Sequence, residues 1–520
     1  MTENDDRSST EAGVHHVEHV LDKKMVDTAA AYDRDTPLSE EDALRVRRKI
    51  DWHLMPLMCI LYLCNFADKA SLGQSAILGI FPGAHLTQNQ FNWLGTIFYI
   101  AFLVFQYPQN IAMQRYPVGK WMTMNIIIWS IALLCHAACD SFAGLFVCRF
   151  ILGACEGAIT PGFLIVTSMF YTREEQTRRV GYWYLMNGFA IIFLGLVSFG
   201  LLHIRSTKFM PWQWLMIITG LLTLVVGVLF WFLFPDSPTS AWFLTEEERV
   251  MAVQRIKVNQ AGIENKVWKQ EQFIETLRDP KTWLFCLFAA ISNLFNSLIN
   301  QRLIIVSQFG FSIYNTTLLG MVDGAVEIIM IYIGVILATS RPIGRAYAAV
   351  ILFIPGILGE ILVNTLPSKN NVGLLLSFYL ALGSICAFII FLGWVAPTTA
   401  GHTKRISTNA IVMVGYCIGN IAGPFMWKKE YQPRNRVPWT VITVSSFLSC
   451  VLLLVIRYML AKENKRRDQE QHDSAYDEVY IATGVEGQKG GGEKGVEKRK
   501  VDKAFLDLTD IQNREFRYIL

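Results

Sequence analysis

Four ionisable residues lie inside two apolar stretches, where a charged group is unfavourable unless it meets a partner or water. Asp68 and Lys69 belong to the stretch 53–81, and Arg149 and Glu156 belong to the stretch 142–170. Arg149 and Glu156 are seven residues apart, which places them on one helix face but about 10 Å from each other, too far for a direct salt bridge. We therefore expect their partners to be Lys69 and Asp68, whose charges have the matching signs.

Such a group of four could hold an anion on its two cations and protons on its two carboxylates. Burial and a nearby cation act in opposite directions on the pKa of a carboxylate, so movement of a cation can switch its affinity for a proton. We predict that Asp68 and Glu156 carry protons, and that Lys69 and Arg149 contact an anion, with Asn65 beside them. Two alternatives are a structural ion-pair cluster that only fixes helix packing, and a short first span, 53–67, that Asp68 and Lys69 merely end.

Polar side chains also gather in two later apolar stretches. Asn293, Asn296 and Arg302 lie in the stretch 281–306, and Asp323 and Glu327 lie one helical turn apart in the next one. We predict that these five residues contribute to substrate specificity. Near the end of its stretch, the guanidinium of Arg302 could instead simply reach the membrane surface.

The composition indicates a protein that crosses a membrane many times. Of the 520 residues, 52% are hydrophobic and only 17% charged, too few to cover the surface of a soluble protein of this size. The net charge of +4 is too small to indicate nucleic-acid binding. The ten cysteines form no CxxC pair, and no HExxH or phosphate-binding loop is present, so we expect no disulfide framework, metal, cofactor, enzyme activity or ATP-driven pump.

Twelve stretches are long and apolar enough to span a membrane as helices. They fall as six and six around a polar central segment, which predicts an all-α fold of two six-helix halves. We expect an N-terminal tail over 1–51, a first half over 52–235, a central loop over 236–280, a second half over 281–461 and a C-terminal tail over 462–520. The expected spans are 53–81, 91–114, 119–139, 142–170, 180–203, 212–235, 281–306, 315–338, 345–366, 372–397, 407–427 and 438–461.

Basic residues next to the span ends indicate the orientation, because cytosolic flanks are enriched in Lys and Arg. Four precede the first span and four follow the last one: Arg45, Arg47, Arg48, Lys49, Lys462, Lys465, Arg466 and Arg467. Both tails are therefore predicted to be cytosolic. The plasma membrane is the membrane we expect.

Several short motifs resemble those of the anion:cation symporter branch of the major facilitator superfamily, and the nearest resemblance is to the fungal allantoate permease family. The resemblance runs from about residue 45 to the end of the chain. The motifs are Ala-Gly-His-Thr-Lys-Arg at 400–405, Gly-Tyr-Cys-Ile-Gly-Asn-Ile at 415–421, Arg-Phe-Ile-Leu-Gly at 149–153, Phe-Pro-Asp-Ser-Pro at 234–238, Asp-Pro-Lys-Thr-Trp at 279–283, Glu-Asn-Lys-Arg-Arg at 463–467 and Asp-Leu-Thr-Asp at 507–510.

The resemblance implies the major facilitator fold and proton-coupled movement of small organic anions by alternating access. It also implies that Asp68 and Glu156 bind protons, that Lys69 faces the substrate and that Arg149 couples the two. The chain departs from the family pattern at Lys69, where Arg is usual, so that a two-pronged grip on a carboxylate becomes a point charge. It departs again at Gln74, where Asn is usual, and at Gln114, which replaces an acidic residue.

These observations together predict a monomeric secondary transporter that moves a small organic anion or related polar metabolite with protons across a lipid bilayer. Two alternatives use the same fold. One is a proton-linked exporter of a secondary metabolite, and the other is a nutrient sensor that binds its ligand without transport.

Overall fold

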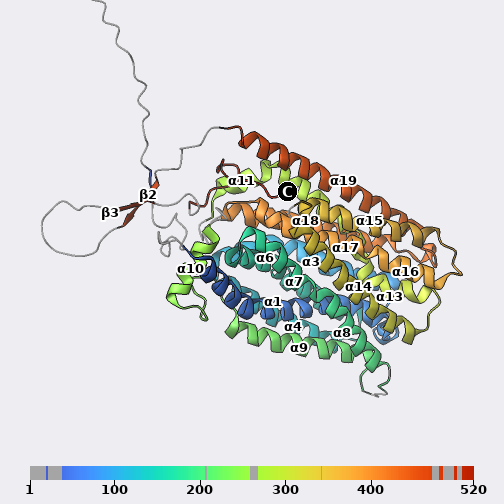
Figure 1. The fold of residues 1–520 in the computed structure, drawn as a ribbon. Coiled ribbons are helices and arrows are strands. Elements are labelled where there is room, and N and C mark those ends of the chain that lie inside the picture. Colours follow the sequence, from blue (N-terminus) through green and yellow to red (C-terminus); the bar gives the residue numbers. More distant parts are fainter. Residues whose placement is uncertain are drawn as a thin grey trace, which may run out of the picture.

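The computed structural model consists of long helices that run side by side (Figure 1). It describes residues 38–204, 208–257, 268–340, 342–470 and 506–520, together with the backbone of three short strands. The α-helices are α1 Glu40–Ile77, α2 Ile80–Gly83, α3 Gln88–Arg115, α4 Val118–His136, α5 Phe142–Glu156, α6 Ile159–Phe170, α7 Arg173–Tyr184, α8 Met186–Leu201, α9 Pro211–Leu233, α10 Glu246–Lys257, α11 Gln270–Arg278, α12 Pro280–Ser292, α13 Leu298–Gln308, α14 Ile313–Thr339, α15 Gly344–Thr365, α16 Asn371–Ala381, α17 Gly383–Val395, α18 His402–Ala422 and α19 Arg436–Arg467.

Short 3-10 turns interrupt or end several of these helices, and the three strands form a small sheet outside the helical body. In that sheet β2 pairs in parallel with β1 and antiparallel with β3. The turns are η3 Phe295–Ser297, η4 Ala396–Thr398, η5 Gly423–Met426 and η6 Lys429–Tyr431, and the strands are β1 His19–Leu21, β2 Val479–Thr483 and β3 Glu497–Lys500.

The twelve expected spans are all helical. In the described part of the chain, eleven of them are long and apolar enough, by helix length and composition alone, to cross a membrane. Several of these spans consist of two consecutive helices, such as α5 and α6. The remaining span is α3, whose average hydropathy is lowered by buried amides that include Gln106, Gln109 and Asn110. A helix that buries amides against its neighbours can span the membrane with less apolar character than one that faces lipid.

Asp68 and Lys69 lie inside α1, which continues to Ile77. The alternative of a short first span that ends at residue 67 is therefore wrong. The helix is broken only at Gly79, whose φ of 94° is a left-handed conformation that a residue with a Cβ rarely adopts.

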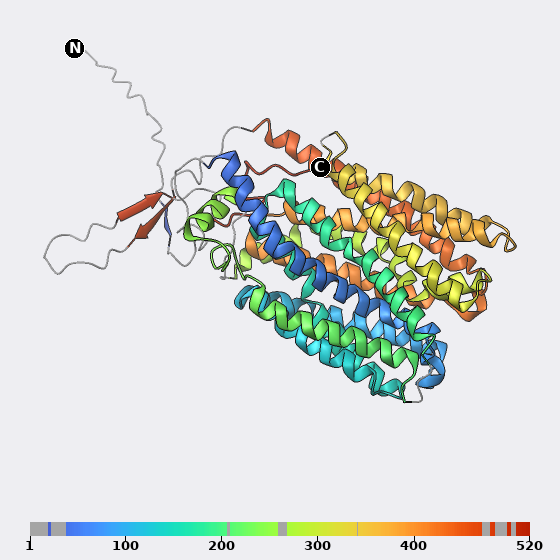
Figure 2. The ribbon, with the colours of Figure 1, turned by 60° about the horizontal axis from the view of Figure 1, so that its bottom comes forward.

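The helices form two six-span halves, drawn in blue to green and in yellow to red (Figure 2). α1–α9 make the first half and α12–α19 the second, with α10 and α11 between them in sequence. The halves pack against each other mainly through α8 against α14, α3 against α18, and α1 against α13. Gly188 and Gly324 permit a close approach of the two backbones, because a Cβ on Gly188 would lie 2.4 Å from the carbonyl oxygen of Gly324.

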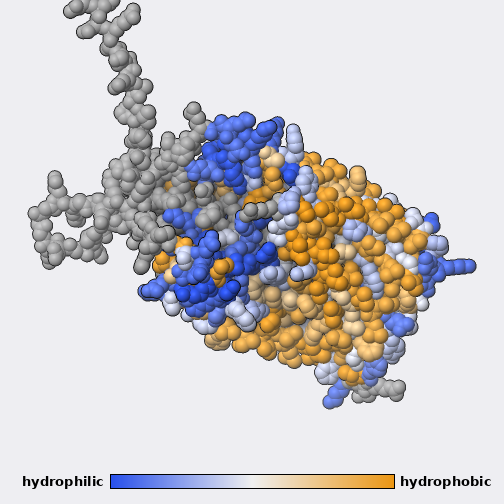
Figure 3. Space-filling view, viewed as in Figure 1, coloured by the Kyte–Doolittle hydropathy of each residue, from blue (hydrophilic) through white to orange (hydrophobic). Residues whose placement is uncertain are grey.

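On the face that Figure 3 shows, apolar residues cover the middle of the bundle and polar residues gather toward its two ends. Large apolar side chains on the outer faces of several helices are exposed, among them Phe232 on α9, Ile354 on α15 and Phe447 on α19. An apolar surface this continuous is expected where protein faces lipid rather than water. The chain is therefore a multi-pass membrane protein.

One end of the bundle carries the start of α1, both helices α10 and α11, and residues 506–520; we call it the terminal face (Figure 1). Polar contacts connect its segments. Lys49 pairs with Glu248 on α10 at 2.6 Å, and Arg179 pairs with Asp51 at 2.7 Å.

Residues 506–520, the docked tail, pack against the second half at the terminal face. The carboxylate of Asp510 is fully buried and lies 2.6 Å from Nζ of Lys281 and 3.0 Å from Nζ of Lys404. The hydroxyl of Tyr518 donates a hydrogen bond to it at 2.7 Å. Burial by itself raises the pKa of Asp510, but the two ammonium groups outweigh burial and hold the pKa well below its ordinary value.

Main-chain hydrogen bonds fix the end of the docked tail. The indole of Trp394 donates to the carbonyl oxygen of Ile519 at 2.6 Å, and the carbonyl oxygen of Leu520 accepts from the amide of Arg345 at 2.9 Å. The tail therefore ties together α12, α15, α17 and α18. The motif at 507–510 has a structural role, because Asp507 also caps α18 by accepting a hydrogen bond from the amide of His402 at 2.6 Å.

We predict that Asp510→Asn lowers the melting temperature of the purified protein by several degrees. The substitution leaves Lys281 and Lys404 with less counter-charge, and removing one partner of a buried ion pair costs about 3 kcal/mol. Because the folded-state pKa is depressed, the difference from wild type should be constant above about pH 5 and shrink only below about pH 4. Thermal unfolding of both proteins in detergent as a function of pH measures this difference in melting temperature.

Asp468→Asn is the matched control, because Asp468 pairs with Arg517 of the same tail but its side chain is 63% exposed. It should change the melting temperature by little. Equal melting temperatures for Asp510→Asn and wild type would contradict a stabilising role of the buried cluster.

Candidate functional site

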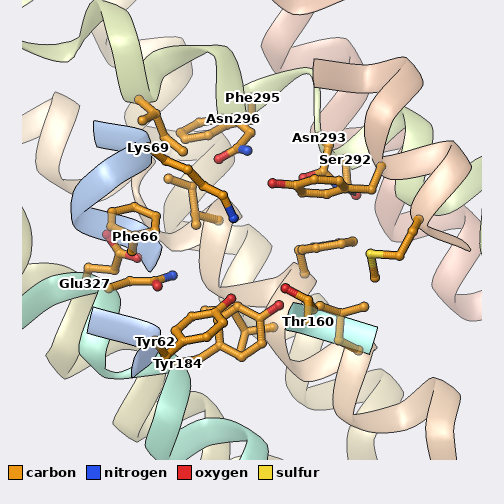
Figure 4. Close-up of a pocket in the computed structure, with 18 of the residues that line it drawn as sticks. Tyr62, Phe66, Lys69, Thr160, Tyr184, Ser292, Asn293, Phe295, Asn296 and Glu327 are labelled. Carbon is orange, nitrogen blue, oxygen red and sulfur yellow. Dashed lines mark hydrogen bonds between the residues drawn. The ribbon is translucent and has the colours of Figure 1, made fainter. Parts of the chain in front are cut away.

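A cavity lies between the two halves, in the middle of the bundle (Figure 4). The space between its lining side chains, including the part open to solvent, is roughly 770 Å³. Its walls come from α1, α3, α6, α7 and α8 of the first half and from α12, α13, α14, α17 and α18 of the second. Seven aromatic side chains make most of the apolar wall: Tyr62, Phe66, Phe102, Tyr184, Phe295, Phe388 and Tyr416.

Contacts between the halves cover the cavity on both sides. Toward the terminal face, the amide of Gln114 donates to the hydroxyl of Thr403 at 3.4 Å. Toward the opposite face, the rings of Trp93 and Phe425 lie 5.6 Å apart, and a Cβ on Gly73 would lie 2.9 Å from a carbonyl oxygen of α13. The two halves are therefore in contact on either side of the cavity.

Lys69 and Glu156 form the ion pair that the charge pattern predicts. Nζ of Lys69 lies 3.3 Å from Oε2 of Glu156 and donates a hydrogen bond to Oδ1 of Asn65 at 2.9 Å. The amide of Asn65 in turn donates to Oε2 of Glu156 at 2.9 Å. Of these three residues, Lys69 lines the cavity, whereas Glu156 and Asn65 are buried behind it.

Asp68 points away from the cavity although it is next to Lys69 in sequence. Its Oδ2 accepts hydrogen bonds from the indole of Trp129 at 2.7 Å and from the hydroxyl of Thr223 at 3.1 Å, which places it against α4 and α9. It is fully buried, and its Oδ1 has no hydrogen-bond partner. The position suits a buried proton site rather than a substrate contact.

Arg149 is buried near both carboxylates but is not a wall residue of the cavity. Glu156 and Asp68 are its strongest electrostatic neighbours, yet neither lies within 4.0 Å as an ion pair among the described residues. Its Nε and Nη2 atoms have no hydrogen-bond partner. The predicted coupling role fits this position, whereas direct contact with substrate would need a rearrangement of the site.

Two of the predicted second-half residues, Asn293 and Asn296, line the cavity. The amide of Asn296 donates to Oδ1 of Asn420 on α18 at 2.7 Å, and Asn420 donates to the carbonyl oxygen of Tyr416 at 2.8 Å. The 3-10 turn η3 interrupts the helix at this point and turns both Asn293 and Asn296 toward the space between the halves.

Glu327 lines the cavity as well, and Asp323 is buried one turn further along α14. Among the described residues, neither oxygen of Asp323 accepts a hydrogen bond, and the amide of Asn187 on α8 is the polar side chain that interacts with the carboxylate of Glu327. Arg302 is the cation that acts on both, and it is only 5% exposed, so its guanidinium stays inside the bundle instead of reaching the surface.

Several important residues are not among the sequence predictions. Trp129, Thr223 and Asn187 carry polar groups that are compatible with an ordinary membrane helix, so no pattern distinguishes them. Glu360 is different, because a carboxylate inside the stretch 345–366 meets the same criterion that identified Asp68. It is fully buried away from the cavity, where it accepts hydrogen bonds from Ser384 at 2.7 Å and Ser446 at 2.9 Å.

Known proteins with similar sequences are transporters. The thiamine pathway transporter of Saccharomyces cerevisiae is 36% identical over 487 residues, covering 92% of this chain and 87% of that protein. An allantoate permease of the same yeast is 31% identical over 504 residues, covering 94% and 88%. A high affinity cysteine transporter, also from that yeast, is 28% identical over 506 residues, covering 95% and 94%.

These names differ in substrate, so they do not single out the allantoate permease family. They do show that the chain is a transporter and not an enzyme. Among solved structures, a proton:xylose symporter has a TM-score of 0.61 at 12% identity and covers 78% of this chain and 96% of its own, which shows a shared fold. The family model named Major Facilitator Superfamily matches residues 58–424. The chain belongs to the major facilitator superfamily.

Proposed function

We propose that the protein is a secondary active transporter that moves a small organic anion or a related polar metabolite together with protons. The cavity between the halves is the transport site, and it opens alternately to the two sides of the membrane. The observation that carries this proposal is the position of Lys69, whose ammonium group lies at the cavity wall and is shared with the buried carboxylate of Glu156.

The shared ammonium group makes proton binding and anion binding depend on each other. At an effective dielectric constant of about 20, unit charges 3.3 Å apart interact by roughly 5 kcal/mol, so ionised Glu156 competes strongly with a substrate anion for Lys69. A proton on Glu156 removes this competition. An anion on Lys69 in turn favours the protonated form of Glu156, because binding linkage is reciprocal.

Asp68 and Arg149 extend this coupling. Asp68 is the neighbour of Lys69 on α1, so a movement of α1 toward or away from the substrate also shifts Asp68 relative to Trp129 and Thr223. Arg149 interacts with both acidic groups and can compensate whichever one is ionised. We assign Asp68 and Glu156 as proton carriers and Arg149 as the coupling residue.

We further propose that the terminal face is cytosolic and that the protein works as a monomer in the plasma membrane. Support comes from the basic residues that flank the first and last spans, which lie together at the terminal face. Basic residues near the ends of α7 and α18 at that face, which include Arg178, Arg179 and Lys404, have the same preference.

We predict that Glu156→Gln uncouples transport from the proton gradient. Metabolite profiling of cells with and without the protein identifies the carried compound, and its labelled form is then followed in vesicles that contain the protein. Wild type should accumulate it when the outer side is made acidic. The variant should still exchange labelled for unlabelled compound but should no longer accumulate it, because its neutral amide cannot release a proton.

Glu360→Gln is the matched control, because Glu360 is an equally buried acid that lies away from the cavity, and it should retain gradient-driven accumulation. Accumulation by Glu156→Gln equal to wild type would contradict the coupling role. Accumulation only when the inside of the vesicles is made acidic would indicate exchange against protons and therefore export. Binding without any flux would indicate a sensor.

We predict that Lys69→Gln weakens transport of the same compound at every pH, with the apparent KM raised at least about tenfold by loss of a charge-assisted contact. In wild type the KM should fall as the pH falls, because protonation of Glu156 makes Lys69 available. In Glu156→Gln it should be low and independent of pH.

The double variant distinguishes a shared group from two independent ones. Because Glu156 acts on the anion through Lys69, Glu156→Gln should change the KM of Lys69→Gln by much less than it changes that of wild type. Additive effects of the two substitutions on the KM would contradict the competition between Glu156 and substrate.

A further inference from the structure

The two charged side chains that line the cavity come from opposite halves and differ in how they are compensated. Lys69 of α1 already has Glu156 and Asn65 as partners. Glu327 of α14 has none of comparable strength among the described residues, because the neutral amide of Asn187 is its hydrogen-bonding neighbour and no basic group lies within 4.0 Å of its carboxylate. Glu327 is nevertheless fully buried from solvent.

The surroundings of Glu327 do not supply the missing charge. Asp323 adds a second buried carboxylate, whose oxygens accept no hydrogen bond in the described part of the chain, and Arg302 on α13 is the cation there that acts on both acids. The other polar neighbours are neutral: the amide of Asn187 on α8 and the thiol of Cys386 on α17. Two carboxylates therefore face one guanidinium, and a buried carboxylate that lacks a partner is strongly unfavourable.

We propose that the transported substrate carries a cationic nitrogen, which Glu327 binds, in addition to the anionic group that Lys69 binds. The substrate is thus a small zwitterion. This inference rests on the proposed transport function of the cavity and specifies its substrate class. Glu327 is the specificity residue for the nitrogen, and Asp323 increases the negative potential behind it.

The rest of the cavity wall is compatible with such a substrate. Tyr62, Phe66 and Tyr184 present aromatic rings to the same space as Glu327 (Figure 4), and aromatic faces attract cations. The amides of Asn293 and Asn296 can donate to an anionic group or accept from an ammonium group. A zwitterion held by Lys69 and Glu327 would also connect the first half to the second, which favours contact between the two halves.

The test compares wild type, Glu327→Gln and the control Glu360→Gln in lipid nanodiscs. Each protein is incubated with the polar metabolite extract of its expression host, washed, and analysed for retained compounds by mass spectrometry. The affinity of each retained compound is then compared with that of its analogue, in which hydrogen replaces the nitrogen group. The measure of affinity is the ligand concentration that gives half of the maximal increase in melting temperature. Unaltered melting temperatures of the unliganded variants confirm that they fold. If Glu327→Gln does not fold, Glu327→Asp replaces it in the same comparison.

We expect wild type and Glu360→Gln to retain compounds with both an anionic group and a cationic nitrogen, and to bind the analogues at least tenfold more weakly. Glu327→Gln should bind each compound and its analogue with similar affinity, and Glu327→Asp should keep a reduced preference. Retention by wild type of only acids that lack a cationic nitrogen, or an unchanged preference in Glu327→Gln, would overturn the inference but leave proton-coupled transport intact. Retention of nothing, together with no flux in vesicles, would overturn both.

Discussion

A charge inside a membrane has to find its compensation within the protein, and this constraint explains the centre of the structure. Lys69 lies on α1 and Glu156 on α5, and only the packing of these helices brings the ammonium group within 3.3 Å of the carboxylate. Asn65 holds the pair from both sides, since it accepts from Lys69 and donates to Glu156. Because the ammonium group also reaches the cavity wall, its compensation can change whenever a proton or an anion arrives.

The same constraint distinguishes structural charges from functional ones. At the terminal face, Lys281 and Lys404 are fully buried too, but Asp510 satisfies both of them and Tyr518 completes the network. Such a cluster has no vacant position for a ligand. Behind the cavity wall, by contrast, Oδ1 of Asp68, Oε1 of Glu156, and Nε and Nη2 of Arg149 have no hydrogen-bond partner among the described residues. Incomplete compensation is expected where protons and substrate pass.

Much of this arrangement could be predicted from sequence, because span length and buried charge each leave a direct signal. Twelve apolar stretches predict the twelve spans, and the opposite signs of Lys69 and Glu156 predict their pairing. The direction of each side chain could not be predicted in the same way. Asp68 and Lys69 are consecutive, so the helix turns them about 100° apart, and one faces α4 and α9 while the other faces the cavity. The contacts of the docked tail depend on tertiary packing that no local pattern specifies.

The position of the charges also explains why two halves are needed. Lys69 belongs to the first half and Glu327 to the second, so neither half alone contains a complete site. In the proposed mechanism, water reaches both groups when the halves separate on one side, and each group can exchange its proton or ligand there. When the halves close, water is lost and only a state with matched charges is stable. Closure is then favoured by the correct cargo and opposed by an incompletely loaded site, which is the condition for coupled transport.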